Sequence, residues 1–99
     1  MGFDEDVLKI CKKIPKGKVT TYKEIAIALD YPLAARAVGN ALSKNPTPIK
    51  IPCHRVVSFN GHIGGYINGK EKKIELLKKE GVNVIEDFVD LEEHMFRLK

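Results

Sequence analysis

Apolar side chains recur at helical spacing near the start of the chain, in the set Phe3, Val7, Leu8, Cys11 and Ile14. This spacing places them on one face and predicts an amphipathic helix over residues 3–14. Asp4 is positioned to cap its beginning, and Pro15-Lys16-Gly17 ends it.

Two further short helices are predicted directly afterwards. Thr21 and Glu24 have the S/T-x-x-E spacing of a capping box, which opens a helix that runs through Leu29. Asp30-Tyr31-Pro32 breaks the pattern, and an alanine-rich helix is predicted from Leu33 to Ser43. Two short helices joined by a tight turn are typical of a helix-turn-helix.

The second half of the chain alternates turns with short apolar runs. Asn60-Gly61, flanked by Val56-Val57 and Ile63, predicts a β-hairpin. A helix is expected from an N-cap at Asn68-Gly69 through Glu80, with Gly81 ending it. Residues 82–89 are expected to hold a short strand, and Asp90 to cap a last helix. The predicted fold is mainly α: a single small domain over residues 1–99, with a winged-helix-like helix-turn-helix and a short β-hairpin.

Composition narrows the class of protein. The 99 residues are 43% hydrophobic and 30% charged, which is a globular balance rather than a disordered one. No apolar run is long enough for a membrane span, and the acidic N-terminus lacks the apolar segment of a signal peptide. Two cysteines do not suggest a secreted disulfide scaffold, so a reduced, cytoplasmic monomer is expected. The net charge of +4 is compatible with a polyanionic partner.

Cys53 is the first candidate for chemistry. A thiol becomes a nucleophile when it ionises, and His54 and Arg55 stand next to it in the sequence. Adjacent residues on a strand point apart, so a Cys-His pair here would need a bend or a bridging water. The alternative is a buried structural thiol, a common role for a lone cysteine.

A metal site is not expected from this sequence. The residues that could supply soft ligands are Cys11, Cys53, His54, His62 and His94. None of them forms a C-x-x-C or H-x-x-x-H pair, which are typical of zinc sites. We therefore expect neither a metal nor another cofactor.

Arg36 and Glu80 each have two interpretations. Ala34, Ala35 and Ala37 make the helix around Arg36 slim, so it could enter a groove, or it could pack closely with Arg36 left as a solvated charge. Glu80 would lie at the negative end of its helix dipole, which favours a partner such as His54 but also fits an ordinary exposed glutamate. The lysine-rich segment before Glu80 is typical of a solvated helix face: Lys70, Lys72, Lys73, Lys78 and Lys79.

The run Ile51-Pro52-Cys53-His54-Arg55-Val56-Val57 resembles the active-site motif of the O6-alkylguanine-DNA alkyltransferases. Further segments resemble other motifs of that family in the same order, over roughly residues 3–81. They are Ala34-Ala35-Arg36-Ala37-Val38-Gly39 for the recognition helix, Asn45-Pro46 for the hinge, Gly64-Gly65-Tyr66, and Leu76-Leu77-Lys78-Lys79-Glu80-Gly81.

The resemblance implies repair of alkylated guanine in double-stranded DNA. The damaged base would be flipped into a pocket, and its alkyl group would pass once and permanently to Cys53. By the same resemblance, His54 takes the thiol proton through a water, Glu80 orients His54, Tyr22 donates to the leaving guanine, and Asn45 stiffens the hinge.

The resemblance also assigns residues to DNA and to the base. Arg36 would fill the gap left by the flipped nucleotide, with the helix pair docked in the minor groove. The implied DNA-binding set is Arg36, Ala34, Ala35, Tyr22, Gly39 and Lys44. The implied pocket set is Val56, Tyr66, Ile67 and Arg55.

The chain departs from the family pattern in several places. Most members carry an additional N-terminal domain, which these residues do not include. Ile67 stands where a serine is common, which leaves only its backbone N–H for the guanine oxygen, and Ser43 stands where a basic residue is frequent. Two other functions stay open at this point. One is a lesion sensor without transfer, although the presence of Cys53 argues against it, and the other is a plain helix-turn-helix regulator with a structural Cys53.

Overall fold

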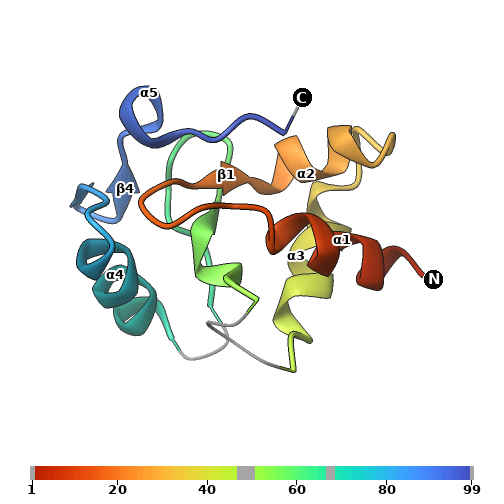
Figure 1. Ribbon diagram of the computed structural model, residues 1–99, viewed down its shortest axis with the longest axis horizontal. Helices are drawn as coiled ribbons and strands as arrows, with labels where there is room; N and C mark the ends of the chain where they lie inside the picture. Colours follow the sequence, from red (N-terminus) through yellow and green to blue (C-terminus); the bar gives the residue numbers. More distant parts are fainter. Residues whose placement is uncertain (1, 47–50, 67–68, 99) are drawn as a thin grey trace.

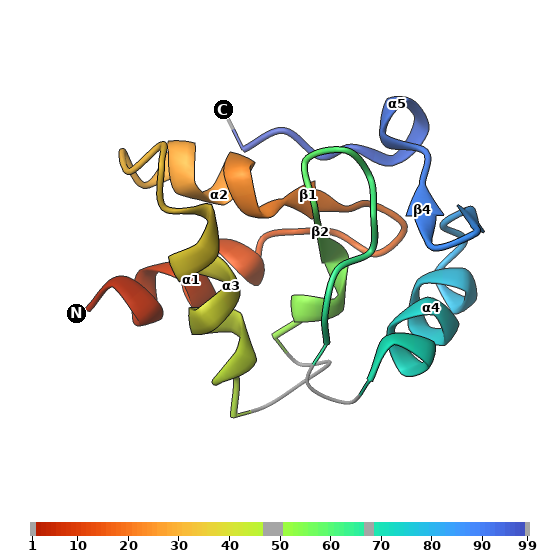
Figure 2. The same cartoon turned by 180° about the vertical axis from the view of Figure 1, so that it is seen from behind.

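The N-terminal half of the protein is a three-helix arrangement. The computed structural model describes residues 2–46, 51–66 and 69–98. Helix α1 (Phe3–Cys11) and helix α2 (Tyr22–Ala28) both pack against α3 (Ala35–Ser43). In Figure 1, α1 lies in front of α3, and Figure 2 shows the opposite face, with α3 toward the viewer. The pair α2 and α3 is the predicted helix-turn-helix.

The predicted helix limits hold for α2 and need correction for α1. The backbone N–H of Glu24 donates to Thr21 Oγ1 at 3.0 Å, so Thr21 caps the helix as predicted. Helix α1 begins after Gly2, with Asp4 inside the first turn instead of at the cap, and it ends at Cys11. The bonds that follow, Lys13 N to Ile10 O and Ile14 N to Cys11 O, belong to a tighter turn, because Pro15 disfavours helical geometry in the preceding residue.

The strand that follows the active-site motif pairs differently from the prediction. Strand β2 (Val56–Val57) runs parallel to β1 (Thr20–Thr21), not antiparallel to the segment around Ile63. Both valines are fully buried, and burial on both faces is typical of a parallel strand instead of a half-exposed hairpin strand. Asn60-Gly61 does form a turn, in which the Gly61 N–H donates to Ser58 O at 2.9 Å.

The hairpin of the fold lies closer to the C-terminus. Strands β3 (Val84–Ile85) and β4 (Phe88–Val89) are antiparallel, and the residues between them, Glu86 and Asp87, have φ of 49° and 68°. Two positive φ values are the requirement of a tight two-residue hairpin turn, which glycine and asparagine usually supply. The absence of those residue types here explains why the sequence pattern pointed to Asn60-Gly61 instead.

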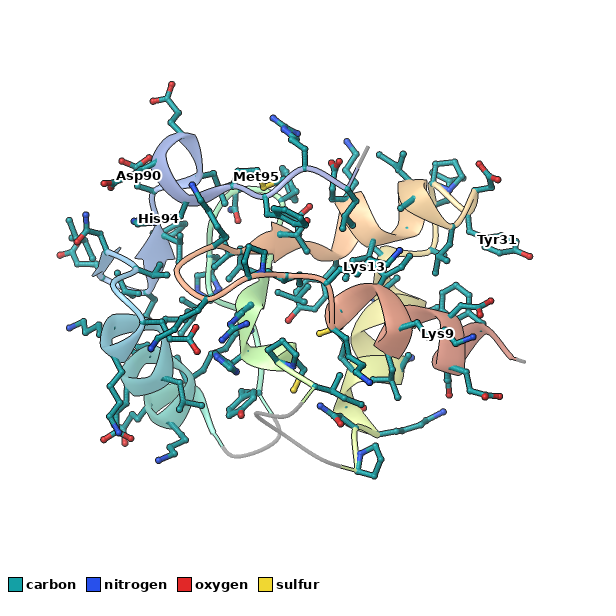
Figure 3. All side chains as sticks on the ribbon, in the orientation of Figure 1. Lys9, Lys13, Tyr31, Asp90, His94 and Met95 are labelled. Atoms are coloured by element: carbon teal, nitrogen blue, oxygen red, sulfur yellow. The ribbon has the colours of Figure 1, made fainter. Side chains whose placement is uncertain are left out.

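The remaining elements follow the predicted order. A single 3₁₀ turn, η1 (Cys53–Arg55), precedes β2, and helix α4 (Lys70–Lys79) ends at Glu80, with Gly81 at φ 89°. Helix α5 (Leu91–His94) is capped by Asp90, as predicted. Figure 3 marks Asp90, His94 and Met95 on this final segment, where the Val19 N–H donates to His94 O.

Two clusters of buried side chains lie on either side of the β1–β2 pair. One joins the three N-terminal helices to Cys53 and Val56, and the other surrounds Leu77 of α4. The segment 53–57 therefore contributes to both clusters, through Cys53 and Val56 to the first and through Val57 to the second. Within the described residues, no helix is long and apolar enough to cross a membrane.

Candidate active site

Cys53 lies at the wall of a cavity of about 260 Å³. The 3₁₀ turn η1 gives the backbone the bend that a strand would lack, so Cys53 and His54 need not point in opposite directions. The thiol is free, and the residue is 5% exposed. The cavity is mostly apolar, and it is lined by Tyr22, Gly39, Leu42, Ser43, Cys53, Gly65 and Tyr66.

The side chains of His54 and Arg55, which follow Cys53 in the sequence, both contact the carboxylate of Glu80. His54 Nε2 lies 3.0 Å from Glu80 Oε2. Arg55 donates to both carboxylate oxygens, from Nε to Oε1 at 2.8 Å and from Nη2 to Oε2 at 2.6 Å. Burial raises the pKa of Glu80, but the hydrogen bonds from Arg55 and His54 outweigh it, and the net shift is downward. Glu80 is therefore an ionised partner and not the exposed glutamate of the alternative interpretation.

The contact with Glu80 fixes the form of the His54 ring. An ionised carboxylate only accepts hydrogen bonds, so Nε2 carries the proton and Nδ1 keeps a lone pair. Burial lowers the pKa of His54, although Glu80 opposes the shift, so the ring is held neutral. Nδ1 is buried and has no hydrogen-bond partner among the described residues. An accepting nitrogen without a partner, one residue from a thiol, is suited to receive a proton.

Two residues predicted for the pocket are placed elsewhere by their contacts. Besides Glu80, the Arg55 guanidinium donates to Ile14 O at 2.7 Å, and Arg55 is not among the residues that line the cavity. The Val56 side chain is fully buried, and its carbonyl accepts from Lys73 at 2.7 Å. Tyr66 does line the cavity, whereas Ile67 lies outside the described residues.

Tyr22 lies on the opposite wall from the motif, as the first residue of α2. Burial raises its pKa to about 12, so the phenol keeps its proton and can act as a donor. Its hydroxyl approaches Gly64 so closely that a Cβ there would lie 2.8 Å away, and Gly64 has φ 73°. Only glycine leaves room for the phenol at this point.

Lys73 is the site residue that sequence reasoning missed. It was assigned to a solvated face, yet it is fully buried in the structure. Its Nζ donates to Val56 O at 2.7 Å, to Gly65 O at 3.0 Å and to Tyr22 Oη at 3.4 Å. Burial lowers its pKa to about 8. A signal was present: Lys73 lies four residues before Leu77, on the buried side of α4.

Asn45 connects the helix pair to the motif, where the hinge was expected. Its side-chain amide donates to Ile51 O at 2.8 Å, and its own N–H donates to Leu42 O. The residue is 2% exposed. This contact joins the end of α3 to the segment that leads into Pro52 and Cys53.

A second, more open groove of about 400 Å³ runs along α3 and shares Tyr22, Gly39 and Gly65 with the cysteine cavity. Arg36 is exposed at its wall. The full lining is Tyr22, Lys23, Ala35, Arg36, Gly39, Asn40, Ser58, Phe59, Gly64 and Gly65. Of the remaining predicted DNA contacts, Ala34 packs against the core at the start of α3, and Lys44 pairs with Asp4 of α1 at 3.2 Å.

Cys11, His62 and His94 lie outside the cavity lining and make structural contacts. Cys11 is in the core, where burial raises its pKa to about 12, and His62 packs edge-on against Phe88. His94 accepts from the Asn83 N–H and contacts Gly17 O. Within residues 2–46, 51–66 and 69–98, no group of three or more such side chains could hold a metal ion.

Comparison with known proteins agrees with the arrangement of motifs. Residues 2–82 match the family model described as 6-O-methylguanine DNA methyltransferase, DNA binding domain. The chain belongs to this family. It is 54% identical over 84 residues to a methylated-DNA–protein-cysteine methyltransferase of Saccharolobus islandicus, which is 85% of this chain and 54% of that relative. The corresponding protein of Methanosarcina barkeri is 46% identical over 82 residues, which is 83% of this chain and 52% of that relative. The chain thus spans about half the length of these curated relatives.

Solved structures show the same fold. Mycobacterium tuberculosis OGT in complex with DNA matches with a TM-score of 0.78 at 42% identity, covering 81% of this chain and 50% of that one. Atl1 of S. pombe, in complex with damaged DNA containing O6-carboxymethylguanine, matches with a TM-score of 0.85 at 30% identity. That match covers 98% of this chain and 99% of Atl1. The predicted mainly α fold with a helix-turn-helix and a short hairpin is therefore confirmed, although the hairpin lies at β3–β4.

Proposed function

We propose that this protein repairs O6-alkylguanine in double-stranded DNA by one irreversible transfer of the alkyl group to Cys53. The observation that carries the proposal is the cavity at Cys53, backed by a His54 ring whose Nε2 is fixed by Glu80 and whose Nδ1 is left as an acceptor. The proposal includes a monomer that acts in the cytoplasm and needs no cofactor. O4-alkylthymine is a further candidate substrate.

The transfer is a single displacement at the alkyl carbon. The Cys53 proton passes to His54 Nδ1 through a water, and the thiolate sulfur attacks the carbon bonded to guanine O6. The C–S bond forms as the C–O bond breaks, and the guanine leaves with the electron pair. The Tyr22 phenol, whose pKa burial raises to about 12, donates to this leaving base and offsets its negative charge.

Lys73 supports the same step from behind Tyr22. Its ammonium group has donor contacts with the Tyr22 oxygen and with the carbonyls of Val56 and Gly65. A positive charge next to the phenol oxygen stabilises the negative charge that develops on that oxygen as the phenol donates its hydrogen to the leaving base. We infer that Lys73 is a positioning residue for Tyr22 and for the Gly64-Gly65 backbone.

The groove along α3 gives the route for the nucleotide. It joins the cysteine cavity through shared walls at Tyr22, Gly39 and Gly65. In the proposal, α3 lies against the duplex, and Arg36 occupies the space that the flipped nucleotide leaves. A planar guanidinium can stack and donate several hydrogen bonds there, which an ammonium cannot.

Two alternative functions would not involve alkyl transfer to Cys53. A lesion sensor would prefer alkylated DNA without forming a thioether, and a helix-turn-helix regulator would have no preference for the lesion. The match over nearly the full length of Atl1, whose structure contains damaged DNA, gives the sensor its support. A thiol at the cavity wall, next to an accepting ring nitrogen, supports transfer instead.

The deciding experiment is mass spectrometry of the intact protein after incubation with duplex DNA that carries O6-methylguanine. Transfer adds one methylene, about 14 Da, and peptide mapping should assign it to Cys53. The Cys53→Ser variant is the control and should gain no mass while it still binds the duplex. Binding with preference for the lesion but without added mass would identify a sensor, and binding without preference would identify a regulator.

A further inference from the structure

Phe59 is a large apolar side chain that is 72% exposed. It lies in the turn after β2, in which the Ser58 N–H donates to His62 O at 2.8 Å and the Gly61 N–H donates to Ser58 O at 2.9 Å. A phenylalanine so exposed contributes little burial to the fold, and its ring is accessible to a bound partner.

The turn that contains Phe59 is anchored by contacts with the β3–β4 hairpin. The Val89 N–H of the hairpin donates to Gly61 O at 2.8 Å, and the His62 ring packs edge-on against Phe88. A Cβ at Gly61 would lie 2.6 Å from Val89 O, and Gly61 has φ 92°, so this close approach requires glycine. The hairpin thus fixes the direction in which the turn projects.

Phe59 faces the groove that contains Arg36. Both residues line it, together with Lys23 and with Tyr22 and Gly65 of the cysteine cavity. Figure 2 shows the loop after β2 and helix α3 on the same face of the molecule. The groove is therefore lined by cationic side chains and by the exposed Phe59 ring, and it adjoins the cavity of the proposed acceptor thiol.

This combination fits a nucleic-acid strand better than an apolar protein segment. Lys23 matches a phosphate group, and an aromatic ring matches the face of a base, on which it stacks regardless of sequence. We propose that Phe59 stacks on a base of the bound DNA next to the flipped nucleotide, across the groove from Arg36. This proposal rests on the proposed function and adds a DNA contact to it.

The absence of tryptophan from the chain provides a direct test. Phe59→Trp creates a protein with a single indole, whose fluorescence should be quenched when alkylated duplex is added. Ile85→Trp is the matched control, because Ile85 is also 72% exposed but lies on the β3–β4 hairpin, away from the groove lining. Quenching of the Phe59→Trp variant alone supports stacking, and equal responses of the two variants, or none in either, would overturn it.

Affinity measurements test the same contact through its chemistry. Phe59→Ala should weaken duplex binding by roughly 5- to 150-fold, the range for loss of one base–aromatic stack. Because no ion pair is lost, the slope of log affinity against log salt should stay as in the wild type. Lys23→Ala, by contrast, should make that slope shallower by about 0.9, because it removes a cation of the groove that faces a phosphate in this proposal.

The outcomes separate this inference from the proposed function. A wild-type protein that binds and accepts an alkyl group, with a Phe59→Ala variant of equal affinity, would reject the role of Phe59 and leave the transfer intact. A changed salt slope in Phe59→Ala would also reject stacking. A wild-type protein that neither binds alkylated duplex nor gains mass would reject the proposed function itself. Thermal melting of each variant checks that the fold is retained.

Discussion

Glu80 connects His54, the base of the proposed transfer, to the packing of the fold. Arg55 holds both of its oxygens, and His54 Nε2 contacts the second of them at 3.0 Å. Arg55 thus contacts the carboxylate that holds His54, and its role in the guanine pocket stays a prediction of the family motif. Its further bond to Ile14 O anchors this support to the N-terminal helices.

At this residue scale, Glu80→Gln should slow alkyl transfer by roughly 10²–10⁴-fold, the usual contribution of a positioned base. The amide no longer stabilises the charged imidazole that forms when His54 accepts a proton. Single-turnover transfer from O6-methylguanine duplex measures the effect, and duplex affinity should change little. Glu75→Gln is the matched control, since Glu75 pairs with Lys72 on the exposed face of the same helix. An unaltered rate in Glu80→Gln would remove Glu80 from the mechanism.

The pH dependence of stability follows from His54 and then Glu80. Burial lowers the pKa of His54 below its usual 6.5, so as the pH falls past 6.5 the unfolded chain binds a proton that the folded chain does not. The free energy of unfolding should therefore decrease from that pH downward, and decrease further below 4.5, because the pKa of Glu80 is also lowered. Urea denaturation between pH 7 and 4 measures this. In His54→Asn the first part of the decrease should be smaller, and an identical profile would contradict the assignment.

Lys73→Met should lower both stability and transfer rate. Methionine fills a similar volume but leaves the carbonyls of Val56 and Gly65 without their donor. The Val56 carbonyl is buried, and leaving it unsatisfied should cost about 1–3 kcal/mol. Tyr22 loses the neighbouring charge as well. Lys72→Met, one residue away on the exposed side, should change neither the melting temperature nor the rate. Equal effects of the two substitutions would show that Lys73 has no special role.

The sequence singles out Cys53 and His54 as candidates because their order next to Pro52 is distinctive, and their roles in transfer stay predictions. The burial of Lys73 was not predictable, because a lysine among lysines is normally solvated. Its burial depends on acceptors that come from β2 and the Gly64-Gly65 segment. Such a cage is a property of the tertiary structure.

At the scale of elements, local signals were reliable and pairing was not. The Thr21 and Asp90 caps were correct because a cap involves only neighbouring residues. The predicted partner of β2 was wrong: Val56–Val57 pairs with residues 20–21, and nothing in the local sequence encodes that pairing. The hairpin at β3–β4 was missed as a pair because its turn places Glu86 and Asp87 at positive φ without glycine.

The cap of α2 carries a prediction at this scale. Thr21→Ala should cost about 1 kcal/mol of folding free energy, the typical value for a lost N-cap. It should also slow transfer, because Tyr22 is the first residue of the helix that Thr21 caps. Asp90→Ala removes the cap of α5 and serves as the control, with a similar change in melting temperature and no change in rate. If both variants transferred at the wild-type rate, the cap would be only structural.

At the scale of the whole molecule, the proposed transfer consumes its own acceptor. Each chain should take up one alkyl group and stop, since a thioether on Cys53 is not cleaved by the neighbouring groups and Cys11 is buried in the core. Mass spectrometry of the intact protein after incubation with an excess of alkylated duplex measures the number of alkyl groups per chain. More than one turnover per chain, or a label on Cys11, would contradict the mechanism.

The position of α4 in the chain has a consequence for how the protein is made. Both partners that complete the site, Glu80 for His54 and Lys73 for Tyr22, come from the segment that follows the motif in sequence. A chain synthesised from its N-terminus exposes Cys53 before either partner exists. The thiol thus lacks its assembled base until α4 has docked. Under the proposed function, a nucleophile that can be used only once therefore stays without its base on the nascent chain until the segment after the motif has folded.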